Sequence, residues 1–199
     1  LGASLCSNWP KNKDKAINCL YVSNIAPYKH QWVVIKAIQL LRNKGYNLKL
    51  TLAGGGEGKS KALVDFEINS HSFVEILGHV EHVKLPDLLS NSNLFIFASS
   101  CENMPNTLVE AMALGLPIAC SDRGPMPEIL ENGGLYFNPE NYISIANSIE
   151  KIITNSKKRD FISTRAKELS KKYSWKRCSL EIFESLLSTY KYSKDKNER

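Results

Sequence analysis

The stretch LFIFASSCENMPNTLVEAMALGLP, residues 94–117, predicts a strand, a loop and a helix in succession. The apolar run at 94–98 is typical of a buried strand, and the helix is expected over about 106–114. Glu102 falls in the intervening loop and Glu110 falls inside the helix. The two carboxylates therefore flank a helix N-terminus, where backbone N–H groups are available to bind phosphate.

The rest of the chain repeats this alternation of short apolar runs and helical patterns. In the first helical pattern, Val34, Ile35, Ile38 and Leu41 recur on one face. Further strands are predicted at 19–22, 48–52, 73–77, 117–120 and 133–137, and the last helices at 140–154, 157–172 and 175–191. Strands separated by helices favour parallel pairing with right-handed crossovers. We expect an α/β fold: a doubly wound, Rossmann-like parallel sheet of about six strands, helices on both faces and a helical C-terminal tail, with ligands at the carboxyl ends of the strands.

Composition limits the class of protein. With 43% hydrophobic residues among 199, the chain can form one sizeable core, so we expect a linker at 1–17, one domain at 18–191 and a disordered tail at 192–199. The five scattered cysteines argue against a disulfide framework or a zinc ribbon and fit a cytoplasmic protein. No apolar run is long enough to span a membrane, and no signal peptide opens the chain. Because it begins at Leu1, we interpret it as a fragment of a longer protein.

The charge is uneven along the chain. Residues 151–199 hold fourteen Lys and Arg against six Asp and Glu, whereas residues 1–150 hold twelve against fourteen. A nucleic-acid reader would carry the excess on its binding domain beside aromatic platforms, so we expect no nucleic-acid partner. The basic tail is either a solvated helical face or a patch attracted to anionic lipid headgroups.

Glu110 also has a purely structural interpretation. Residues 107–110 fit a capping box, in which the Glu at the third helical position reaches back to the N-terminus of the helix. That interpretation does not account for Glu102, nor for the small residues at 111, 113 and 115 that would let the helix lie close to its neighbours. A functional role for the pair of carboxylates is therefore favoured.

The Glu-x7-Glu segment at 102–110, followed by Ala-Met-Ala-Leu-Gly-Leu-Pro-Ile, resembles the donor-site signature of the group 1 family of retaining nucleotide-sugar glycosyltransferases. The resemblance extends over about 19–190. It includes the loop with Lys29, the glycine-rich run at 52–58, Leu-Gly-His-Val at 77–80, the segment 124–128 and Tyr-Ser-Trp at 173–175. It covers the C-terminal half of a two-domain architecture, the GT-B fold.

The resemblance implies a site for a nucleoside-diphosphate sugar without a metal or another cofactor. It places Lys29 on the phosphates, Glu102 beside the donor sugar and Glu110 on the ribose hydroxyls, and carboxylates suit hydroxyl donors. The helix N–H groups near Asn106, Thr107 and Leu108 would contribute fixed positive potential as the leaving diphosphate gains charge. Further donor contacts are expected from Asn24, Gly54, Gly78, His79 and Val80.

The chain departs from the family pattern at three places. Many relatives carry Arg where this chain has Asn24, so one expected cation is missing. Relatives commonly have Gly where His30 and Asn103 stand here.

Two other motifs suggest competing chemistries. Residues 53–60 differ from the P-loop form G-x-x-x-x-G-K-[ST] only at Ala53, which leaves a nucleoside triphosphatase using Lys59 as an alternative. Glu57 would place a negative charge in the phosphate cradle, which argues against it. His79 and His82 lie three residues apart, which is weak evidence for a metal site.

We therefore expect the donor-binding half of a retaining glycosyltransferase that serves a glycan or lipid-linked acceptor in surface polysaccharide synthesis. A missing N-terminal domain would hold the acceptor, and the fragment alone would bind donor without turnover because one wall cannot close the cleft. Contact with the anionic inner face of the membrane would suit a lipid-linked acceptor. A nucleotide-sugar epimerase of the same fold and a non-catalytic sugar-binding module remain alternatives.

Overall fold

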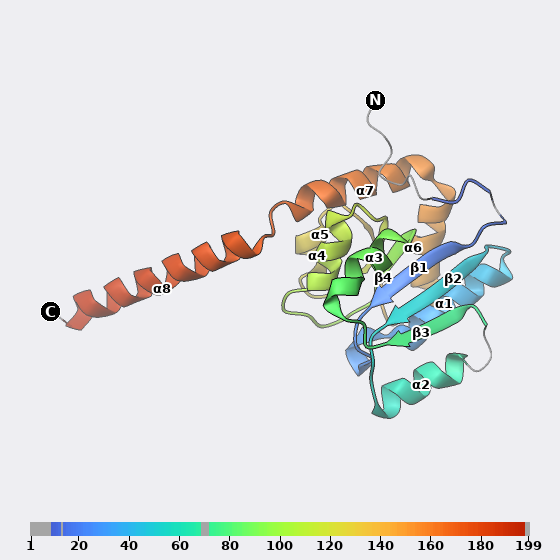
Figure 1. Ribbon diagram of the computed structural model, residues 1–199, viewed down its shortest axis with the longest axis horizontal. Coiled ribbons are helices and arrows are strands. Elements are labelled where there is room, and N and C mark those ends of the chain that lie inside the picture. The colour runs from blue at the N-terminus through green and yellow to red at the C-terminus, as the bar shows by residue number, and fades with distance from the viewer. Residues whose placement is uncertain (1–8, 13, 69–71, 198–199) are drawn as a thin grey trace.

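The computed structural model describes residues 9–12, 14–68 and 72–197 (Figure 1). A six-stranded parallel sheet forms its centre, with the strand order β3-β2-β1-β4-β5-β6. The strands are β1 (Ile17–Val22), β2 (Leu48–Ala53), β3 (Val74–Gly78), β4 (Leu94–Phe97), β5 (Ile118–Ser121) and β6 (Leu135–Phe137). All six match the predicted strands within two residues, and the predicted fold class is confirmed.

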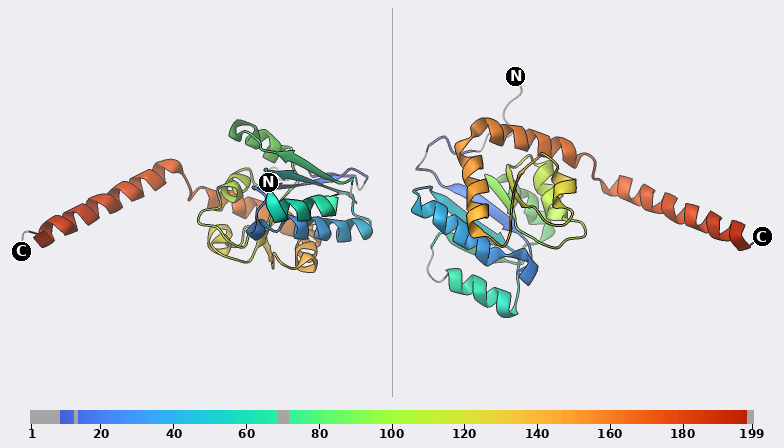
Figure 2. Two further views of the ribbon diagram at one scale, coloured as in Figure 1. Left: turned by 90° about the horizontal axis from the view of Figure 1, so that it is seen from below. Right: turned by 180° about the vertical axis from the view of Figure 1, so that it is seen from behind.

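Helices cover both faces of the sheet (Figure 2). Helix α1 packs against α2 and α6, whereas α4 packs against α7. The α-helices are α1 (Gln31–Asn43), α2 (Gly58–Ile68), α3 (Leu85–Ser90), α4 (Asn106–Ala113), α5 (Met126–Leu130), α6 (Tyr142–Thr154), α7 (Ser156–Ser170) and α8 (Trp175–Asn197), with the 3-10 turns η1 (Pro27–Lys29) and η2 (His82–Lys84).

Burial explains why the chain folds this way. Strands β4 and β5 are buried along their whole length, as expected of parallel strands with helices on both faces. The predicted face of α1 is confirmed, because Val34, Ile35, Ile38 and Leu41 are fully buried against the sheet. One continuous apolar core therefore fixes the sheet and the loops that leave its carboxyl edge.

The strand order places the candidate site. The chain builds the sheet outward from β1 through β2 to β3 and then returns to pair β4 with the other side of β1. The loops that follow β1 and β4 consequently leave the same edge in opposite directions. Such a reversal creates a crevice in which doubly wound sheets bind their ligands.

The C-terminal helix differs from expectation. Helix α8 runs to Asn197, so the disordered tail predicted from residue 192 is wrong as far as the structure describes it. Every described side chain from Trp175 to Ser193 is exposed, and α8 projects away from the domain (Figures 1 and 2). Residues 1–8 and 13 of the predicted linker and residues 198 and 199 of the predicted tail lie outside the described residues.

Candidate functional site

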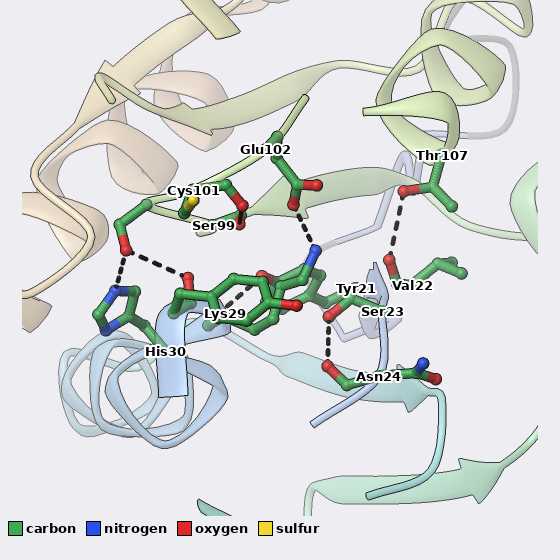
Figure 3. Close-up of polar contacts among 12 residues, drawn as sticks. Tyr21, Val22, Ser23, Asn24, Lys29, His30, Ser99, Cys101, Glu102 and Thr107 are labelled. Atoms are coloured by element: carbon green, nitrogen blue, oxygen red, sulfur yellow. Dashed lines mark hydrogen bonds and ion pairs between the residues drawn. The ribbon is translucent and has the colours of Figure 1, made fainter. Parts of the chain in front are cut away.

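Two loops form the candidate site at the carboxyl ends of β1 and β4 (Figure 3). The Ser100 N–H, in the loop after β4, donates to the Tyr28 carbonyl at 2.8 Å, in the loop after β1. The Ser100 hydroxyl is hydrogen-bonded to Nε2 of His30 at 2.9 Å. These bonds hold the two loops together although they are about 70 residues apart in the sequence.

Lys29, expected on the donor phosphates, and Glu102, expected beside the donor sugar, form an ion pair across these loops (Figure 3). Only 12% of the Lys29 side chain and 14% of the Glu102 side chain is exposed. The ammonium of Lys29 also lies 5.7 Å from the centroid of the Phe97 ring, at the end of β4. The fold therefore brings Lys29 and Glu102 together in a largely desolvated place, where charges interact more strongly than in water.

A buried tyrosine positions the backbone of Lys29. The Tyr21 hydroxyl, on β1, donates to the Lys29 carbonyl at 2.7 Å, and its ring packs edge-on against Phe97 at 6.0 Å. Burial raises the pKa of Tyr21 far above its ordinary value, so the phenol stays protonated and keeps this donor. Sequence reasoning did not identify Tyr21 because it lies within an apolar strand.

His30 adopts a backbone conformation that usually requires glycine. Its φ of 53° and ψ of 30° are left-handed, which explains why Gly is suited to this position. The ring is buried beside Ser100, and burial lowers the pKa of His30 more than the charge of Glu140 raises it. This chain thus has a histidine at a position that suits glycine, and the His30 side chain links the two loops through its hydrogen bond with Ser100.

Asn24 lies at the carboxyl end of β1, as predicted, and is exposed. Its backbone is held by Gln31, which is 2% exposed and whose amide donates to the Asn24 carbonyl at 2.9 Å and to the Ser23 hydroxyl at 3.0 Å. Gln31 therefore fixes the shape of this loop, a role that the sequence did not indicate.

The glycine-rich loop after β2 packs against the loop after β1. A side chain at Gly54, whose φ is 141°, would place its Cβ 2.0 Å from the Ser23 carbonyl oxygen, and one at Gly56 would lie 2.6 Å from Ile25. The Gly54 N–H donates to the Gly78 carbonyl at 2.7 Å. Close approach of backbones therefore accounts for these two glycines without a phosphate, which favours a tight turn here over the P-loop alternative.

Helix α4 starts at the site but lacks the predicted capping box. The N-cap residue is Pro105 rather than Thr107, and the side chain of Pro105 makes no capping hydrogen bond. The Thr107 hydroxyl instead donates to the Val22 carbonyl at 3.3 Å, which ties the start of α4 to the end of β1. The N–H groups of Asn106 and Leu108 already donate to Met104 and Pro105 carbonyls at 3.0 Å, so fewer N–H groups face the crevice than predicted.

Glu110 contacts His82 rather than the N-terminus of its own helix. Oε1 of Glu110 lies 3.1 Å from Nε2 of His82, which comes from η2 after β3. Its other oxygen, Oε2, is buried and has no hydrogen-bond partner among the described residues. Glu102 and Glu110 thus have different partners at the same sheet edge, and His82 is a contact that sequence reasoning missed.

The predicted positions after β3 lie at the same edge of the sheet. Gly78 has a left-handed φ of 66°, His79 is exposed, and Val80 packs partly against the core. Within the described ranges, no group of three or more His, Cys, Asp or Glu side chains is arranged to hold a metal ion. None of the described helices combines the length and apolar character that crossing a membrane requires.

A Rossmann-like sheet with an ion pair at its switch point has the architecture of α/β domains that bind ligands. A family model described as glycosyl transferases group 1 matches residues 7–169, and the chain belongs to this family. The resemblance inferred from the segment 102–110 is therefore confirmed.

Known proteins of similar sequence and structure agree with the family. The chain is 26% identical over 165 residues to the O-antigen chain mannosyltransferase B of Escherichia coli, covering 81% of the chain and 43% of that protein. It is 28% identical over 175 residues to the capsular polysaccharide biosynthesis glycosyltransferase CapM of Staphylococcus aureus, covering 85% and 44%. The crystal structure of Anabaena HepE in complex with UDP-glucose matches with a TM-score of 0.77 at 23% identity, covering 87% of this chain and 49% of that one. The chain thus spans less than half the length of these two curated relatives.

Proposed function

We propose that the crevice binds a nucleoside-diphosphate sugar and that the whole protein transfers the sugar, with retention, to a glycan or lipid-linked acceptor in polysaccharide synthesis. The single observation that carries the proposal is Oε2 of Glu110, a buried acceptor without a donor among the described residues, at the carboxyl edge of the sheet. A buried polar atom without a partner is costly, and a ribose hydroxyl would satisfy it.

The charges of the crevice suit the rest of this ligand. Lys29 can exchange the Glu102 carboxylate for a donor phosphate, since both are anions within reach of the same loop. Thr107 lies in the first turn of α4, where its N–H and the helix dipole favour negative charge. Glu102, once released from Lys29, would lie beside the sugar. The loop at Asn24, Gly54 and the residues 78–80 would border the nucleotide.

The comparisons support the class of ligand and process. The HepE structure is a complex with UDP-glucose, and the names of the two bacterial relatives place them in O-antigen and capsular polysaccharide synthesis. This chain matches less than half of each of these three proteins, which is consistent with an N-terminal acceptor domain outside it. One wall of a cleft cannot exclude water, so we expect the 199-residue chain to bind donor without turnover.

Helix α8 suits a partner outside this chain. Leu186 is 64% exposed and Phe183 is 61% exposed. Among the described side chains of α8, none of the apolar ones is buried by the rest of the domain. We propose that the acceptor domain covers this face, and that the basic residues of α7 and α8 lie near anionic lipid at the inner face of the membrane in the cytoplasm.

Thermal-shift measurements with UDP, GDP, ADP and ATP test the proposal, because a bound ligand raises the melting temperature by mass action. We expect a nucleoside diphosphate to stabilise the chain equally with and without EDTA. Glu110→Ala and Lys29→Ala should each weaken that binding, whereas Lys59→Ala should not. Magnesium-dependent ATP binding that Lys59→Ala abolishes would instead establish the triphosphatase. Donor binding followed by a change of the sugar configuration, with no transfer by the full-length protein, would establish the epimerase.

A further inference from the structure

We propose that His82 is a positioning residue that holds Glu110 for one ribose hydroxyl and thereby sets how strongly the site distinguishes ribose from deoxyribose. The inference rests on the proposed function and goes beyond it in naming a residue and a specificity. It is based on the different surroundings of the two carboxylate oxygens of Glu110. Oε1 contacts Nε2 of His82 at 3.1 Å, whereas Oε2 is buried without a partner among the described residues.

The direction of the hydrogen bond follows from the chemistry of the partners. A carboxylate oxygen can only accept, so Nε2 of His82 carries the proton in this contact. The donor fixes the rotation of the carboxyl group, because turning it would break the bond. Oε2 is therefore kept at one place, as an acceptor whose own partner has to come from outside the described protein.

The placement of the two residues favours this role over a structural one. His82 comes from η2, after the edge strand β3, and Glu110 comes from α4, after the central strand β4. The contact therefore spans the carboxyl edge of the sheet, where the ligand is expected. The His82 side chain is 84% exposed, whereas that of Glu110 is 33% exposed. An interaction with so exposed a ring adds little to folding stability, so its main effect falls on the orientation of the carboxylate.

If the carboxylate of Glu110 is held in one orientation, the two ribose hydroxyls should contribute unequally to binding. A freely rotating carboxylate could accept from both hydroxyls or from either one. His82 already donates to Oε1, whereas Oε2 has no donor among the described residues, so the hydroxyl that reaches Oε2 should gain most and dominate. Hydrogen bonds to charged groups are strong enough that loss of this hydroxyl should weaken binding about tenfold or more.

The test measures, by calorimetry, the binding of UDP, 2′-deoxy-UDP and 3′-deoxy-UDP to the 199-residue chain. If the thermal-shift measurements favour a diphosphate with another base, the deoxy analogues of that nucleotide are used instead. In the unmodified chain, we expect one of the deoxy analogues to bind about tenfold more weakly than UDP. His82→Ala should reduce that ratio at least about threefold, and His82→Gln, whose amide can donate to the same oxygen, should restore most of it. Lys84→Ala, in the same 3-10 turn, is the matched control and should keep the full ratio.

The outcomes separate the inference from the proposed function. An unchanged ratio in His82→Ala, or equal binding of all three nucleotides by the unmodified chain, overturns the positioning role while donor binding stands. Failure of the unmodified chain to bind any nucleoside diphosphate removes the proposed function and the inference with it. If His82→Ala does not fold by circular dichroism, His82→Phe, which keeps a ring but has no donor for Glu110, carries the test with the same expected loss of ratio.

Discussion

Replacement of Glu102 by glutamine should tighten the binding of a nucleoside diphosphate, although Glu102 belongs to the proposed site. In the structure, the Lys29 ammonium is ion-paired with the Glu102 carboxylate, and both side chains are largely buried. A phosphate can use Lys29 only by displacing this partner. Glu102→Gln keeps the shape of the side chain and removes its charge, so Lys29 becomes available at lower cost.

The expected gain follows from the strength of the bond that is given up. Hydrogen bonds to charged groups contribute about 1.5–3 kcal/mol, and since Lys29 stays charged, replacing the ion pair by an ammonium–amide bond moves this contact from the upper toward the lower end of that range. The difference, about 1–1.5 kcal/mol, is no longer lost on binding. It corresponds to roughly five- to tenfold tighter binding. Loss of the repulsion between the carboxylate and the diphosphate acts in the same direction.

Isothermal titration with UDP, or with the diphosphate that the thermal screen selects, measures this gain. Lys29→Ala should bind more weakly than the unmodified chain, and adding Glu102→Gln to it should bring no further gain, because the gain acts through Lys29. Lys59→Ala, which removes a lysine outside the crevice, should leave the affinity unchanged. Glu102→Gln that binds no more tightly than the unmodified chain, while melting at a similar temperature, would refute the competition between carboxylate and phosphate.

Two further predictions concern the loops that shape the crevice. Gly54→Ala should lower the free energy of unfolding in urea by at least about 2 kcal/mol, because its Cβ would overlap a backbone oxygen, whereas Gly55→Ala, which meets open space, should change it little. His30→Asn should make stability less sensitive to acid. Burial lowers the pKa of His30 in the folded chain, so its contribution is complete above about pH 6.5 and is lost as the pH falls through the lowered value. Urea unfolding at about pH 5 and pH 7.5, on either side of the ordinary histidine pKa, should show a smaller loss in the variant, and an equal loss would contradict this assignment.

The sequence was sufficient to predict the sheet because its strands are buried on both faces. Apolar runs such as 94–97 can only be accommodated where helices cover both sides, and their alternation with helical patterns leaves few topologies. The end of α8 was predicted wrongly because charged residues near the C-terminus suggest disorder, while the helix continues through them to Asn197.

The partners within the site could not be predicted, because they depend on the strand order. Lys29 and Glu102 were both selected from the sequence, but as neighbours of a ligand rather than of each other. His82 and Glu110 are 28 residues apart and meet only because η2 and α4 leave the same edge of the sheet. The capping box at 107–110 was the structural alternative for Glu110, and in the structure the Thr107 hydroxyl donates to the Val22 carbonyl instead.

The proposed exchange at Lys29 would also explain how the site could bind a diphosphate with Asn24 at the place where the family resemblance suggests Arg. Lys29 is the single Lys or Arg between residues 23 and 30, so it alone supplies a full positive charge from this loop. With Glu102 as its partner, the pair is neutral, and the loops can pack together without a buried, uncompensated charge. In the proposed site, a diphosphate bound to Lys29 would leave Glu102 unpaired beside the sugar. Positive charge that develops at the anomeric carbon during transfer would then find its counter-charge already in place.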